Sequence, residues 1–157
     1  MIVLAEKEGR IFAAETIQRP GDFTCPFPEA LFPCLIWDHA SGFSDEERSM
    51  VARALIDNGC RYAVCAGECC EAWHDTVDAQ LLRQDITDPA GDVEAPFVMT
   101  TWHEGEGPDE VAFFFVVNTN FEDHDFQRYL VLHVGSSDVT ATLNAAVRKY
   151  ALNEDAV

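Results

Sequence analysis

The chain has 157 residues and a formal net charge of −18 at pH 7, from 28 acidic and 10 basic residues. This length predicts a single domain that can bury enough apolar surface to fold without disulfides or a structural metal. So acidic a surface repels phosphate backbones and anionic lipids, which argues against direct binding to nucleic acids or membranes. It would suit a basic protein partner, although acidic side chains also serve solubility alone.

The sequence shows no targeting or membrane segment. The opening residues lack a basic leader followed by an apolar stretch, and no apolar run approaches the ~18 residues of a membrane-spanning helix. Several of the six cysteines lie inside apolar runs, which is typical of reduced thiols and not of a disulfide framework. We therefore expect a cytoplasmic protein with free cysteines; its oligomeric state stays open.

The first third of the chain holds two different patterns. Residues 1–19 contain two apolar stretches around a polar turn, which predicts a β-hairpin or two short strands. Residues 20–33 contain four prolines. Prolines at that density predict an extended connector without a regular helix or a central strand.

From residue 34 onward, short apolar runs alternate with helical patterns. Strands are predicted over residues 34–37, 62–65, 97–101 and 129–134. Ser44 and Glu47 have the spacing of a capping box and predict a helix start, and further helical stripes cover residues 70–81 and 139–150. Pro108 is typical of a first helical turn. The following residues 111–117 fit either a helix or a strand.

Fully apolar strands alternating with amphipathic helices predict a mainly parallel sheet covered on both faces. The expected fold class is α/β, a three-layer sandwich of the Rossmann-like or flavodoxin-like type with an N-terminal hairpin-like extension. We expect one domain over residues 1–157, in which residues 1–33 pack on a core formed by residues 34–152.

Polar side chains cluster where the predicted strands end. In open α/β sheets, ligands bind beyond the carboxyl ends of the strands. Residues at these ends are therefore the candidates for ligand binding: Asp38, His39, Thr101, Glu104, Ser136 and Ser137. His133 lies near the same edge.

The segment from Ala63 to Cys70 contains a cysteine near the end of a predicted strand and just before a helix. A helix N-terminus stabilises a thiolate, and its free N–H groups can bind an oxyanion. The segment resembles the nucleophile elbow of class I glutamine amidotransferases and their relatives, in which a strand runs into a Cys-x-Gly turn. The resemblance implies that Cys65 is a nucleophile. The alternative is that Cys65 and Cys70 are buried core residues, as free cysteines usually are.

No cofactor or metal site is predicted. Cys60, Cys65, Cys69, Cys70 and His74 lie close in sequence, but without the ligand spacing of a zinc site. Nucleotide-binding glycine motifs are also absent from the sequence.

Two functional hypotheses follow. The first is a small acidic, non-catalytic interaction or regulatory protein, such as an adaptor, an inhibitor or an immunity-like protein, that binds a protein partner. The alternative is a cysteine-dependent hydrolase or amidotransferase-like enzyme. Its catalytic residues would be Cys65 or Cys69 as nucleophile, His103 or His39 as base, and Glu68 or Glu104 as the group that orients the base.

Overall fold

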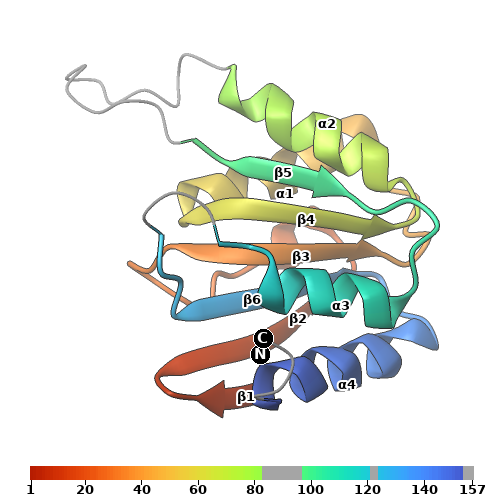
Figure 1. Ribbon diagram of the computed structural model, residues 1–157. Helices are drawn as coiled ribbons and strands as arrows, with labels where there is room; N and C mark the ends of the chain where they lie inside the picture. Colours follow the sequence, from red (N-terminus) through yellow and green to blue (C-terminus); the bar gives the residue numbers. More distant parts are fainter. Residues whose placement is uncertain (83–96, 121–123, 154–157) are drawn as a thin grey trace.

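The computed structural model describes residues 1–82, 97–120 and 124–153. Within these residues, six strands form one sheet in the order β1-β2-β6-β3-β4-β5 (Figure 1). Of the strand pairs in the described residues, only β1 and β2 are antiparallel, and the other neighbouring pairs are parallel. The elements are β1 (Ile2–Lys7), β2 (Arg10–Ile17), the 3-10 turn η1 (Pro20–Asp22), β3 (Phe32–Asp38), α1 (Asp45–Asp57), β4 (Cys60–Gly67), α2 (Cys70–Leu81), β5 (Met99–Trp102), α3 (Pro108–Val117), β6 (Arg128–Val134) and α4 (Val139–Leu152).

Helices cover both faces of the sheet, which confirms the predicted α/β sandwich. One apolar cluster joins α1 and α2 to the sheet, with Leu55 and Trp73 fully enclosed. The other joins α3 and α4 to the opposite face, through Phe115 and Leu143. In Figure 1, α3 and α4 lie in front of the sheet.

Local signals set the helix starts. The Ser44 hydroxyl accepts the Glu47 N–H at 3.1 Å, and the Glu47 carboxylate accepts the Ser44 N–H at 3.0 Å, so the predicted capping box is present. Pro108 opens α3, and the ambiguous residues 111–117 belong to this helix. The sequence of α3 fits a helix and a strand equally because the helix is apolar on most sides, where it packs on the sheet and on α4.

The N-terminal segment is more closely integrated than the sequence predicts. The hairpin of β1 and β2 is confirmed, and β2 also pairs in parallel with β6. The prediction that residues up to 33 exclude a central strand was wrong, because β3 begins at Phe32 and includes Pro33. The register shifts between Phe32 and Pro33, and such an irregularity is where a strand tolerates a residue without an N–H.

The connections define a switch point in the sheet. Strands β3 and β6 are neighbours, yet β3 leads into α1 on one face and β6 leads into α4 on the other. At such a point the two loops diverge and leave a crevice beyond the carboxyl ends of the strands. In the part of the chain that the structure describes, no helix is long and apolar enough to span a bilayer.

Candidate functional site

Two histidines meet at the switch point between β3 and β6. His39 directly follows β3, and His133 is the penultimate residue of β6. Trp37 is the register partner of His133, so the ring of His133 lies on the α3–α4 face. The two histidines are 94 residues apart in sequence, and only the pairing of β3 with β6 brings them together.

A chain of hydrogen bonds links these histidines to a serine and an asparagine. The distances are 2.6 Å from Ser137 Oγ to His39 Nδ1, 2.9 Å from His39 Nε2 to His133 Nδ1, and 2.8 Å from His133 Nε2 to Asn144 Oδ1. Ser137 lies in the turn before α4, and Asn144 lies on that helix. Three separate segments therefore build one continuous polar chain.

Asn144, at the end of this series of hydrogen bonds, determines which nitrogen of each imidazole carries the proton. Asn144 Oδ1 can only accept, so His133 donates from Nε2 and keeps Nδ1 free to accept. His39 then donates from Nε2 to His133, which leaves its Nδ1 to accept the hydroxyl proton of Ser137. The serine hydroxyl is thus aimed at an unprotonated ring nitrogen.

Burial keeps both rings neutral. Desolvation, with a smaller contribution from the neighbouring His133, lowers the pKa of His39 to about 4, while Asp38 opposes this shift. Desolvation also lowers the pKa of His133, against the opposing effect of its hydrogen bond to Asn144. At neutral pH both imidazoles in this hydrogen-bonded series are therefore uncharged.

The end of β3 is held by a buried carboxylate. Asp38 is 3% exposed, and its two oxygens accept from the Ser41 N–H and from Trp73 Nε1, each at 2.8 Å. Trp73 is on α2, so this contact ties the residue before His39 to the opposite helical layer. Gly67, at the end of β4, has a φ of +78°, and a Cβ there would lie 2.4 Å from the Asp38 carbonyl oxygen.

A second histidine-centred group stands beside the first. His103 follows β5 and is buried; its Nδ1 lies 2.5 Å from Glu106 Oε2 and its Nε2 lies 3.0 Å from Thr101 Oγ1. Its ring packs against Phe114 of α3, with 4.6 Å between the ring centroids. The imidazole therefore fixes the position of the Glu106 carboxylate.

Both histidine groups border one cavity of about 450 Å³. Its wall comes from the carboxyl ends of β3 and β4, the loop before α3, and the start of α4. The polar side chains that line it are Asp38, His39, Glu68, His103, Glu106 and Ser137. A space of this size accommodates a small-molecule ligand.

The cysteines lie elsewhere. Cys65 is inside β4, fully buried, and burial raises the pKa of its thiol well above the ordinary value. Cys69 is exposed at the N-terminus of α2, in the left-handed region with a φ of 57°. It lines an adjoining hollow with Cys70, Glu71 and Glu104, and the described residues around this hollow include no histidine.

The structure brings together about half of the predicted site residues. Asp38, His39, Glu68, His103 and Ser137 line the cavity, Thr101 contacts it through His103, and Cys65, Cys69, Glu104 and Ser136 do not line it. Asn144 and Glu106 were not predicted. Asn144 gives no sequence signal, because its role depends on the strand order; Glu106 lies three residues after His103, a spacing that could have suggested the pair.

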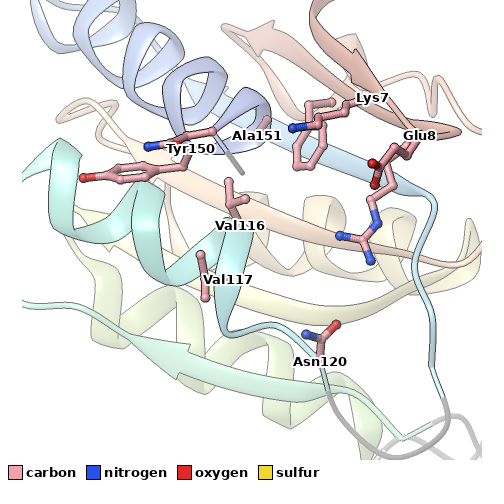
Figure 2. Close-up of a pocket in the computed structure, with 10 residues that line it drawn as sticks. Lys7, Glu8, Val116, Val117, Asn120, Tyr150 and Ala151 are labelled. Carbon is pink, nitrogen blue, oxygen red and sulfur yellow. The ribbon is translucent and has the colours of Figure 1, made fainter. Parts of the chain in front are cut away.

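A different cavity, of about 350 Å³, opens at the opposite end of the strands. Figure 2 shows Lys7, at the end of β1, near Ala151 of α4, with Glu8 of the β1–β2 turn beside it and Val116 and Val117 of α3 below. Its described lining includes no serine, histidine or cysteine, and it lies at the amino ends of the parallel strands. Among the described residues of the whole chain, no group of three or more side chains is arranged to bind a metal.

Comparison with protein families identifies this chain. The model of the family described as "Domain of unknown function (DUF7684)" matches residues 14–150, so the chain belongs to that family. The matched range includes every element that contributes to the cavity. Neither curated proteins nor solved structures give a match.

Proposed function

We propose that this member of the DUF7684 family is a serine-dependent hydrolase that cleaves an ester or amide, with Ser137 as nucleophile and His39 as general base. The observation that carries the proposal is the 2.6 Å hydrogen bond from the Ser137 hydroxyl to a neutral imidazole whose ring is held by a second imidazole. A nucleophile, a base and a group that orients the base are the parts of such a site.

In the proposed reaction, Ser137 Oγ attacks the substrate carbonyl carbon while its proton passes to His39 Nδ1. The tetrahedral intermediate collapses as the bond to the leaving oxygen or nitrogen breaks, and His39 returns the proton to that atom. Water, deprotonated by the same nitrogen, then attacks the acyl carbon, and His39 returns that proton to Ser137 Oγ as the acyl–serine bond breaks. His133 holds the His39 ring in place throughout through its 2.9 Å hydrogen bond.

The start of α4 supplies electrostatic support for the nucleophile. The backbone N–H of Val139 donates to Ser137 Oγ at 3.1 Å, which favours a developing negative charge on that oxygen. Asn144 ends the chain with a neutral amide, where many serine hydrolases have a carboxylate. Because an amide stabilises an imidazolium less than a carboxylate does, we expect a modest catalytic rate.

Labelling with a neutral alkyl fluorophosphonate tests the proposal, because such probes phosphonylate activated serines. Mass spectrometry of the digested protein should place the adduct on Ser137. His39→Gln should slow labelling by about 10²-fold or more, the usual effect of losing a general base. Ser136→Ala is the matched control, since the exposed Ser136 neighbours the nucleophile but does not line the cavity. An unlabelled wild-type protein would refute the proposal.

The cysteine-dependent alternative has less support from the geometry. Cys65 has no exposed surface, and a raised thiol pKa disfavours the thiolate that attacks substrates. Cys69 is accessible at a strand-to-helix turn, but the hollow it lines contains no imidazole among its described residues. A cysteine mechanism at either position would need a rearrangement to bring a base to the sulfur.

A second candidate function, a regulatory protein that binds a basic partner, is favoured by how the cationic side chains are used. Arg48, Arg61, Arg128 and Arg148 all donate to backbone carbonyl oxygens of their own chain. These guanidinium groups are engaged within the chain, and the net charge of −18, which already counts them, is an acidic excess that suits a basic partner.

The binding hypothesis makes its own prediction about salt. Association with a basic partner should weaken steeply between 50 and about 300 mM salt, because exposed charges are screened within about 10 Å at 0.1 M. A pull-down at low salt, compared with the same experiment at high salt, checks this. The same partners recovered equally at both salt concentrations would contradict an electrostatic interface.

A further inference from the structure

The charged side chains around the cavity indicate which class of ester or amide it would bind. Three carboxylates line it, from Asp38, Glu68 and Glu106, and none of its described lining residues is lysine or arginine. Of these, Asp38 is already satisfied, since both of its oxygens accept hydrogen bonds from the protein. Glu68 and Glu106 remain as the charges that a bound molecule would meet.

Glu106 differs from a freely moving surface glutamate. Its carboxylate is held by His103 Nδ1 at 2.5 Å, and that ring is 7% exposed and is fixed from the other side by Thr101. The Glu106 side chain keeps 40% of its surface exposed. A charged group that is held in place yet accessible binds a counter-charge with less loss of side-chain entropy than a mobile one does.

We propose that the substrate of Ser137 is a cationic ester or amide, carrying an ammonium or guanidinium group that pairs with Glu106 and Glu68 in the cavity between β3, β4 and the start of α4. This inference rests on the proposed hydrolase function and deepens it. A carboxylate held in a fixed position accepts hydrogen bonds from either kind of cation. An anionic substrate would meet like charges instead, which disfavours it in the same cavity.

The first test measures how the labelling rate depends on charge. Three fluorophosphonates with the same linker would carry a terminal ammonium, hydroxyl or carboxylate group. We expect the cationic probe to label Ser137 at least about tenfold faster than the neutral one, and the anionic probe to be the slowest. Glu106→Gln should reduce the ratio of cationic to neutral rates to about twofold or less. Glu110→Gln is the matched control, since this exposed glutamate on α3 does not line the cavity and should leave the ratio unchanged.

The second test separates the two proposals by measuring binding without chemistry. Butylammonium chloride, 1-butanol and sodium butyrate would be titrated into the protein while the side-chain NMR signals of His103 are followed. Saturable shifts with butylammonium alone support the cation site, and Glu106→Gln should weaken that binding about tenfold. If the neutral probe labels Ser137 while butylammonium causes no shift and charge does not change the labelling rate, the substrate inference is overturned and the hydrolase stands. If butylammonium binds but no probe labels Ser137, the hydrolase proposal fails and with it the assignment of the cation as substrate.

Discussion

The hydrogen bond between Trp73 and Asp38 gives the sharpest test of how the core supports the site. Trp73→Phe removes the indole donor from a carboxylate that is 3% exposed and leaves one of its oxygens without a partner. A hydrogen bond to a charged group contributes about 1.5–3 kcal/mol. The smaller ring adds a cavity cost of about 1 kcal/mol. We therefore expect the free energy of unfolding to fall by about 2.5–4 kcal/mol, which a domain with a stability of about 5–15 kcal/mol should survive.

A double-mutant cycle isolates the hydrogen bond from the loss of packing. Urea unfolding of the wild type, Trp73→Phe, Asp38→Asn and the double variant should give a coupling energy of about 1.5–3 kcal/mol. Asp38→Asn keeps the size of the side chain and an oxygen that can still accept from Ser41. A coupling energy below about 0.5 kcal/mol, the usual error of additivity, would show that the two side chains act independently and would refute the reasoning.

The remaining predictions concern the pH dependence of the site, its glycine and its thiols. Since neutral His39 accepts the proton and its pKa is about 4, labelling of Ser137 should hold steady from pH 7 to about 5 and decline near pH 4; a decline centred near pH 6.5, the ordinary histidine value, would contradict this. Gly67→Ala should lower the thermal midpoint more than Gly42→Ala does, because both have φ above +70° but only at Gly67 does the added Cβ collide with backbone, 2.4 Å from the Asp38 carbonyl oxygen. Iodoacetamide should alkylate the exposed Cys69 in the folded protein. Burial raises the thiol pKa of Cys34, Cys60 and Cys65, so these three should react only on unfolding. Alkylation of the three buried thiols as fast as Cys69 in the folded protein would contradict the structure.

Sequence patterns predicted the carboxyl ends of the strands, where the candidate site lies, because strand ends and helix caps are local signals. The placement of Asp38, His39 and Ser137 at that edge follows from apolar runs of fixed length. The hydrogen bond between His39 and His133 could not be predicted, because it requires β6 to insert between β2 and β3. Strand order depends on contacts between distant parts of the chain, and no local pattern records it.

The choice of nucleophile shows the same limit. A cysteine near a strand end satisfied the local pattern, but the pattern did not reveal that Cys65 points into the core between the sheet and α1–α2. Ser137 was predicted only as a ligand-binding residue, because a serine before a helix usually serves as a cap. Its proposed role as nucleophile depends on His39, which lies 98 residues earlier in the chain.

The insertion of β6 between β2 and β3 has a consequence for the order in which the protein forms. Strands β3, β4 and β5 with their helices can assemble from neighbours in sequence, whereas the β1–β2 hairpin contacts the rest of the sheet through β6. During synthesis the hairpin therefore emerges before the other strands, but it can dock only after β6 has been made. Such late, long-range pairing slows folding and leaves strand edges open in the meantime. His39 and His133 come together only when β6 docks beside β3. Formation of the hydrogen bond between them would therefore indicate that β6 has joined the sheet.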